Sequence, residues 1–124
     1  MENHYYHITA LENVPSILEK GLLANEDGEI FLFENKAVGY PEKGIMIYVA
    51  DHIALNQVGL KEYVMLEISS DGITCKLVND DVAEICSKHQ WIARQPKILP
   101  QFIEPCGLLK AKGWHKIPKR FQSQ

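Results

Sequence analysis

Residues 5–22 read YYHITALENVPSILEKGL, and the rest of the chain is interpreted outward from this stretch. Its first part, residues 5–9, is rich in aromatic and β-branched side chains and predicts a buried strand. Three apolar residues then recur at helical spacing: Val14, Ile17 and Leu18. Gly21 suits the left-handed position that follows a helix. The stretch therefore predicts a strand that runs into a short helix ending near Lys20.

The start of this helix offers two capping arrangements. Thr9 and Glu12 stand in the S/T-x-x-E relation of a capping box. Asn13 is a second candidate for the N-cap, because Pro15 is tolerated in the first helical turn. Either arrangement predicts that the helix begins at this point.

His7 and Thr9 lie two residues apart on the predicted strand, so their side chains share one face of it. That face is a candidate ligand-binding surface. Simpler explanations exist for both residues. A histidine on an apolar strand is often a structural residue with satisfied hydrogen bonds, and capping alone accounts for Thr9.

The composition indicates one globular domain. The chain has 124 residues, of which 46% are apolar and 23% charged, with a formal net charge of −3. This length buries a core without metal or disulfide support, and the charge balance is unlike that of a nucleic-acid-binding or disordered chain. We assign residues 1–109 to the domain and 110–124 to a basic tail. The tail is either a solvated segment or a contact for a phosphate-bearing partner.

The cysteines and histidines form no metal or disulfide pattern. Three cysteines without CxxC spacing argue against a disulfide framework and a zinc site, and predict buried thiols in a reducing compartment. The five histidines are scattered, so no metal is expected. No cysteine is singled out for a Cys-His nucleophilic pair. The N-terminus lacks a basic region and a long apolar run, which predicts a cytoplasmic protein that does not contact a membrane.

The remaining chain is predicted to contain more strands than helices. Residues 25–28 predict a turn, residues 29–33 a strand with Phe31 and Phe33 on one face, and residues 45–59 a helix in their second half. Strict alternation over residues 63–69 marks the clearest strand.

Further along, the expected elements are an extended segment over 73–78, a short helical or irregular link over 82–85, a strand over 90–93 and a loop between Pro96 and Pro100. A last strand over 102–109 contains Pro105 and Gly107, which suggests a sheet edge. This order predicts an α+β domain with a largely antiparallel sheet and short helices.

Several nucleotide and hydrolase motifs are absent from the chain. It contains no G-x-G-x-x-G, no P-loop, no H-E-x-x-H and no G-x-S-x-G. The order of other motifs resembles the ADP-ribosyltransferase fold family, in the small bacterial branch that includes DNA-modifying toxin transferases and, more distantly, RNA 2′-phosphotransferases. Three motifs match the family, Tyr6-His7-Ile8-Thr9, Ile17-Leu18-Glu19-Lys20-Gly21-Leu22 and Pro100-Gln101-Phe102-Ile103, and the segments Ile30-Phe31-Leu32-Phe33 and Gln90-Trp91-Ile92-Ala93 complete the order.

The resemblance implies a split sheet with an NAD⁺ cleft between its halves. His7 would hydrogen-bond the adenosine ribose with support from Thr9, and Phe31 or Phe33 would flank the nicotinamide. Alternatively, both phenylalanines are core residues. NAD⁺ would be a substrate, and no metal is implied.

The catalytic position departs from the pattern of the family. Active members place a glutamate on the strand before the Pro-x-x-Ile element, where its charge stabilises an oxocarbenium-like state. The matching residue here is Gln90, a neutral amide that can bind a ribose hydroxyl or serve as an ordinary strand residue. Glu84 and Glu67 are the nearest acidic alternatives.

The resemblance therefore implies an NAD-binding ADP-ribosyltransferase-like protein with a nucleic acid or a protein as acceptor. One alternative is a catalytically silent binding module on the same fold, as Gln90 suggests. Another is an RNA 2′-phosphotransferase, for which two arginines, Arg94 and Arg120, are few.

Overall fold

The computed structural model describes residues 4–34, 62–80, 90–110 and 113–115. The strands are β1 (His4–Ala10), β2 (Leu22–Leu23), β3 (Ile30–Glu34), β4 (Tyr63–Ser69), β5 (Val78–Asn79), β6 (Gln90–Ala93), β7 (Lys97–Ile98), β8 (Ile103–Lys110) and β9 (Gly113–His115). The helices are α1 (Val14–Lys20) and three 3₁₀ turns, η1 (Leu11–Asn13), η2 (Ser70–Gly72) and η3 (Pro100–Phe102).

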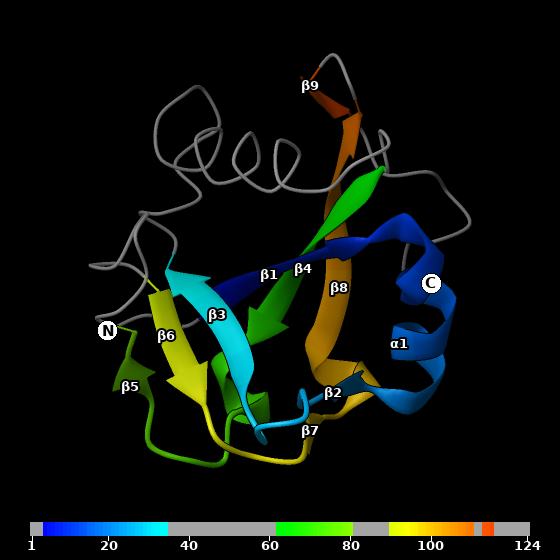
Figure 1. Cartoon of the computed structure of the whole chain (residues 1–124). Coiled ribbons are helices and arrows are strands. Elements are labelled where there is room, and N and C mark those ends of the chain that lie inside the picture. Colours follow the sequence, from blue (N-terminus) through cyan, green and yellow to red (C-terminus); the bar gives the residue numbers. More distant parts are fainter. Residues whose placement is uncertain (1–3, 35–61, 81–89, 111–112, 116–124) are drawn as a thin grey trace.

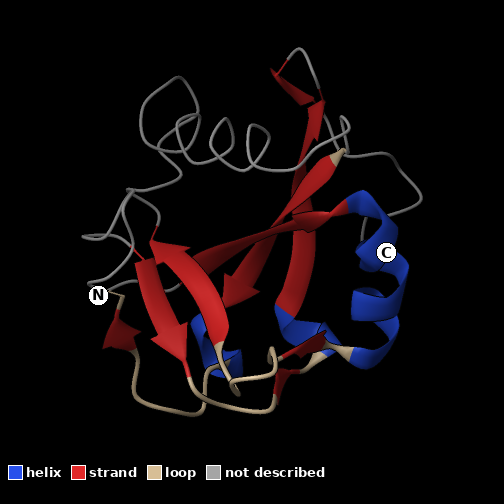
Figure 2. Ribbon diagram, in the orientation of Figure 1, coloured by secondary structure: helices blue, strands red, loops and turns tan. Residues whose placement is uncertain are grey.

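The described strands form a seven-stranded sheet and a two-stranded sheet. The larger sheet has the order β5-β6-β3-β1-β4-β8-β9, and β2 pairs with β7 in the smaller one. Every pair is antiparallel, and α1 lies beside the smaller sheet (Figures 1 and 2). The predicted α+β class, with a largely antiparallel sheet and short helices, is confirmed.

Strand β4 supplies the centre of the core. Its alternate residues Val64, Leu66 and Ile68 are fully buried, as the alternation of the sequence predicted. The face that they occupy packs with Val14 and Ile17 of α1 in one hydrophobic cluster. Burial of these side chains stabilises the sheet and holds α1 against it.

Strands β1 and β3 separate partway along their length. β1 pairs with β4 through all seven residues, but it pairs with β3 only at Tyr5↔Glu34 and Tyr6↔Phe33. Beyond Tyr6 the two strands diverge (Figure 1). The sheet is therefore continuous at one end of β1 and open between β1 and β3 at the other.

Asn13 is the N-cap of α1, as the second predicted arrangement has it, but its side chain makes no capping hydrogen bond. The N-cap of η1 is Ala10 and not Thr9, so the predicted capping box is wrong. The Leu11 N–H instead donates to the Glu62 carbonyl at 2.9 Å, so the backbone that enters β4 satisfies this group. Gly21 ends α1 with a positive φ of +99°, as predicted, but it is the C-cap residue and its ψ of 170° lies outside the left-handed helical region.

Other predicted elements are confirmed, and two of them, β3 and β8, begin and end one residue later than predicted. Gly28 N–H donates to the Asn25 carbonyl at 2.9 Å, which closes the predicted turn, and the strands over 63–69 and 90–93 are present. The loop between Pro96 and Pro100 contains β7. The predicted helix within 45–59 and the link over 82–85 lie outside the described residues.

The predicted extended segment over 73–78 enters a strand only at Val78. The buried side chain of Gln95 takes the place of a strand partner. Its Oε1 accepts from Thr74 N at 2.9 Å and from Cys75 Sγ at 3.3 Å, and its Nε2 donates to the Gly72 carbonyl at 3.0 Å. Because the Gln95 side chain hydrogen-bonds these backbone groups, the segment does not need a neighbouring strand to pair them.

Strand β8 pairs with β4 along one side, and with β9 only over Leu108–Lys110. Among the described residues, the segment around Pro105 is therefore a sheet edge, which agrees with the missing N–H of proline. The register shifts between Met65 and Leu66, which leaves Cys106 without a partner in the ladder. The sheet continues past residue 109 because β9 adds a hairpin to it.

Candidate functional site

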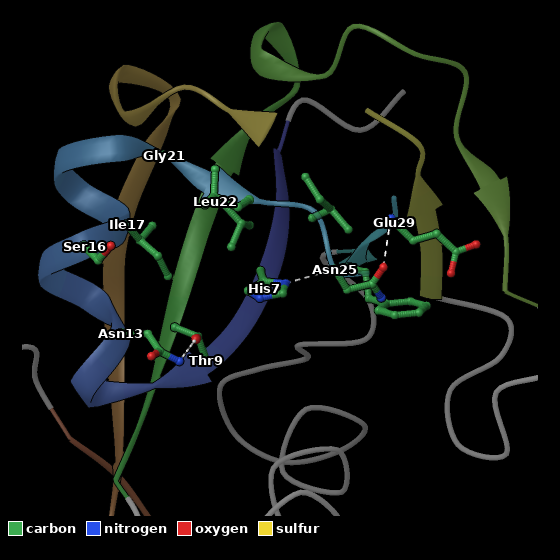
Figure 3. Close-up of a pocket in the computed structure, with 12 residues that line it drawn as sticks. His7, Thr9, Asn13, Ser16, Ile17, Gly21, Leu22, Asn25 and Glu29 are labelled. Carbon is green, nitrogen blue, oxygen red and sulfur yellow. Dashed lines mark hydrogen bonds between the residues drawn. The ribbon is translucent and has the colours of Figure 1, made fainter. Parts of the chain in front are cut away.

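A pocket of about 360 Å³ lies where β1 and β3 have separated. β1 contributes His7 and Thr9, α1 contributes Ser16, and Glu29 lies on the side away from α1 (Figure 3). Phe31 of β3 also lines the pocket. The volume falls at the lower end of the range for small-molecule sites. The pocket therefore has room for a small ligand.

His7 is held in one tautomer by the backbone. Its Nδ1 lies 2.7 Å from the Phe31 carbonyl oxygen, and a carbonyl only accepts, so Nδ1 carries the proton. Burial lowers the pKa of His7 below its ordinary 6.5, and the hydrogen bond to Phe31 opposes this shift only in part. The ring is therefore neutral at pH 7. Nε2 is then left as a hydrogen-bond acceptor at the pocket.

This arrangement makes the stability of the protein depend on pH. Below pH 6.5 His7 is protonated in the unfolded state. In the folded state it stays neutral until the pH falls to its lower pKa, so the unfolded state binds more protons in this window. We therefore expect the free energy of unfolding to fall as the pH decreases through this window, and to recover as the pH rises. Urea unfolding at several pH values between about 5 and 8 measures this change in the free energy of unfolding.

The control for this pH dependence is His7→Asn, whose amide can donate to the Phe31 carbonyl but does not titrate. The difference in unfolding free energy between wild type and this variant should grow in favour of wild type as the pH rises. A difference that is constant across the window would contradict the assigned pKa shift.

Thr9 lines the pocket next to α1. Its Oγ1 accepts a hydrogen bond from Asn13 Nδ2 at 3.3 Å (Figure 3). The hydroxyl proton of Thr9 is therefore directed away from this bond and can be donated to a ligand. The Asn13 side chain that the sequence suggested as a cap orients Thr9 instead.

Glu29 and Arg94 form an ion pair at the rim of the pocket. Arg94 Nη2 lies 3.3 Å from Glu29 Oε2, and the Arg94 side chain is 59% exposed. Such an exposed pair contributes little to stability. Its relevance is to ligand choice, because Glu29 neutralises an arginine that a phosphate would otherwise use.

The sequence-predicted residues divide into two groups. His7, Thr9 and Phe31 line the pocket, whereas Phe33 and Gln90 do not. Phe33 is buried and lies directly opposite Gln90 on β6. Glu84 lies outside the described residues.

The register places Tyr6, Phe33 and Gln90 on one face of the sheet, because directly opposite residues share a face. His7 follows Tyr6 and therefore points to the other face. Glu67 lies opposite Tyr6 and accepts a hydrogen bond from its hydroxyl at 3.3 Å, so it belongs to the Gln90 face. A ligand that reaches both His7 and Gln90 has to pass through the opening between β1 and β3.

The structure adds Asp80, which the sequence analysis did not single out. Gln90 Nε2 donates to Asp80 Oδ2 at 2.6 Å, and Asp80 N donates to the Gln90 carbonyl at 2.9 Å. The two residues are ten positions apart and meet because β5 pairs with β6. An aspartate at the end of a short strand carries no motif, so no local signal identifies it.

The described cysteines are poor candidates for a nucleophile. The predicted burial of the cysteines is wrong for the two described ones, because Cys106 is exposed and Cys75 only partly buried. Desolvation of the Cys106 sulfur, reinforced by the nearby carboxylates of Glu67 and Glu104, raises the pKa of its thiol to about 12. It is therefore protonated at neutral pH, and the thiol is a weak nucleophile. Cys75 donates to Gln95 Oε1 at 3.3 Å, and Cys86 lies outside the described residues.

Comparisons with known proteins assign no family. No protein-family model matches the chain, and neither the curated proteins nor the solved structures contain a match to it. Within the described ranges, no three His, Cys, Asp or Glu side chains are grouped as metal ligands, and no helix is long and apolar enough to cross a membrane. The geometry of the site therefore carries the functional argument.

Proposed function

We propose that this protein binds NAD⁺ as an ADP-ribosyltransferase-like domain. The observation that carries the proposal is His7, held neutral by the Phe31 carbonyl at a pocket that opens between β1 and β3. The motif resemblance assigns this histidine to the adenosine ribose. A neutral imidazole whose Nε2 accepts is matched to a ribose hydroxyl, which donates.

The pocket has the remaining features of a nucleoside site. Thr9 offers a hydroxyl next to His7, and partly buried Phe31 offers an apolar wall. Because the pocket is smaller than a dinucleotide, the rest of NAD⁺ extends beyond it. The opening between β1 and β3 supplies that path toward Phe33 and Gln90.

The proposed reaction transfers ADP-ribose to a nucleic acid or a protein. The bond between ribose C1′ and the nicotinamide nitrogen breaks, and its electron pair leaves with neutral nicotinamide. The acceptor nucleophile forms a bond to C1′ and releases a proton. The intermediate charge on the ribose requires a nearby negative group, which Gln90 does not provide.

Isothermal titration with NAD⁺ tests the binding step. His7→Asn retains a donor for the Phe31 carbonyl and removes the acceptor at Nε2, so we expect folded protein with affinity lower by about tenfold, the effect of one hydrogen bond. His7→Ala removes both groups and should bind at least as weakly. His4→Asn is the matched control, because His4 is an exposed histidine of β1 on the opposite face.

The outcomes separate the candidate functions. Absence of binding by wild type, or equal binding by wild type and His7→Asn, would refute the proposal. Release of nicotinamide by wild type would identify an enzyme, and binding without release would identify a catalytically silent module. No contact in the described residues favours RNA 2′-phosphotransfer, because Arg94 is already paired with Glu29.

A further inference from the structure

Two exposed leucines lie beside the smaller sheet. Leu23 of β2 is 59% exposed, and Leu99, which directly follows β7, is 40% exposed. The register places Leu99 two positions beyond Lys97, the residue directly opposite Leu23, so the leucines are diagonal neighbours. Single exposed apolar residues are ordinary. Two neighbouring ones, of which Leu23 also lines the pocket, favour a surface that a partner covers.

The backbone of Leu23 lies on a free strand edge. β2 pairs with β7 on one side only, and the residue after β2, Ala24, donates its N–H to the Pro96 carbonyl at 3.0 Å. Along an antiparallel strand, successive residues alternate between bonding to the partner strand and pointing away from it. The N–H and C=O of Leu23 therefore point away from β7. Within the described residues, neither group makes a hydrogen bond.

This free edge borders the pocket. Leu23 is one of the lining residues, and Gly21 and Leu22, which lead up to it, lie at the border of the pocket in Figure 3. A free edge offers backbone donors and acceptors to an extended peptide, which can add to the sheet as a further strand. A segment bound at this edge would lie next to a ligand in the pocket.

The charge beside the edge selects the composition of such a segment. Lys97 is the only charged residue of β2 and β7, and it is exposed and makes no ion pair with a described residue. It lies directly opposite Leu23, so the two side chains share a face. An apolar side chain flanked by carboxylates complements this pair. Single-stranded nucleic acid is bound largely by stacking on aromatic side chains, and neither Leu23, Lys97 nor Leu99 is aromatic.

We propose that the free edge of β2 is the docking surface for the acceptor, and that the acceptor is a protein. An extended acidic segment of that protein pairs its backbone with Leu23, covers the side chains of Leu23 and Leu99, and places a carboxylate beside Lys97. Identifying the segment as the acceptor rests on the proposed function, whereas the docking surface is defined by the small sheet alone.

A short peptide tests this docking surface without NAD⁺. The probe is fluorescein-labelled Glu-Val-Glu-Leu-Glu with a C-terminal amide, and fluorescence anisotropy measures its binding to the full chain. An analogue that is N-methylated at its central residues cannot donate backbone hydrogen bonds, so it should bind about tenfold more weakly. An analogue with glutamine in place of each glutamate loses the attraction to Lys97 and should also bind more weakly.

Two substitutions separate the backbone of Leu23 from its side chain. Leu23→Pro removes the free N–H, and proline is tolerated on an edge strand where its nitrogen faces away from the ladder. Leu23→Ala keeps the N–H and removes the apolar contact. Each should weaken peptide binding by about tenfold. Val78→Ala is the matched control, because Val78 is 40% exposed on β5, at an edge of the larger sheet.

Lys97→Gln tests the charge. It should weaken binding of the glutamate peptide and leave binding of the glutamine analogue unchanged, whereas a purely structural role of Lys97 would weaken both. Thermal unfolding of each variant checks that folded protein is compared.

The possible results separate this inference from the proposed function. Absence of peptide binding by wild type, or equal binding of the N-methylated analogue, would overturn the docking surface and leave NAD⁺ binding intact. Tighter binding of a labelled oligothymidylate of equal length would overturn the protein acceptor in favour of nucleic acid. Peptide binding by a wild type that does not bind NAD⁺ would overturn the proposed function, and with it the identification of the segment as the acceptor.

Discussion

Replacing Gly21 by alanine is expected to destabilise the protein by about 2–5 kcal/mol, the sum of backbone strain and an overpacked contact. Gly21 has a φ of +99°, a conformation that side chains other than glycine rarely adopt. A Cβ atom there would lie 2.5 Å from the carbonyl oxygen of Ile98. Because Ile98 belongs to β7, which pairs with β2, backbone of the small sheet has to move.

Gly28→Ala is the matched control for this prediction. Gly28 also has a positive φ, +75°, but a Cβ there would meet nothing within 4 Å. It should cost about 1–2 kcal/mol, from the conformational strain alone. Urea unfolding followed by circular dichroism compares the two variants. Equal losses would show that the approach of Ile98 to Gly21 adds nothing to the effect.

Leu66→Ala is expected to lower the free energy of unfolding by about 2–5 kcal/mol, as for other fully buried leucines. Leu66 is 0% exposed at the centre of β4 and lies directly opposite His7 on β1. Removing its side chain leaves a cavity under the strand that carries the candidate site. Chemical denaturation measures the loss, and titration with NAD⁺ on the folded fraction measures its effect on binding.

Met65→Ala is the comparison for Leu66 because it truncates the neighbouring residue of the same strand. Met65 points to the other face of the sheet and is only partly buried. It should therefore destabilise the protein less than Leu66→Ala. A loss at Met65 as large as that at Leu66 would contradict the expectation that the more deeply buried side chain contributes more to stability.

Strands whose apolar residues alternate regularly could be predicted from the sequence. Segments whose backbone groups hydrogen-bond to side chains far along the chain could not. Apolar side chains recur at every second position of residues 63–69 because that face of β4 lies in the core. Burial is therefore visible as a local sequence pattern. The segment over 73–78 has no such pattern. Its bonds to the side chain of Gln95 depend on the contact of two loops, which no local pattern encodes.

The candidate site was predictable to a similar extent. His7 and Thr9 were identified from their spacing on one strand and from the motif resemblance, and both line the pocket. Phe31 also lines it, whereas Phe33 is buried in the sheet. The contact of Asp80 with Gln90 was not predicted, because it arises only where β5 pairs with β6.

The sequence by itself determined that β1 runs into α1 and that His7 and Thr9 share a face, because these features follow from local periodicity and from glycine at position 21. Only the tertiary structure decided where β1 and β3 part, which tautomer His7 adopts and which carboxylate lies beside Gln90. Each of these depends on backbone groups distant in the sequence. The Phe31 carbonyl, 24 residues from His7, holds the ring, and no local pattern specifies that contact.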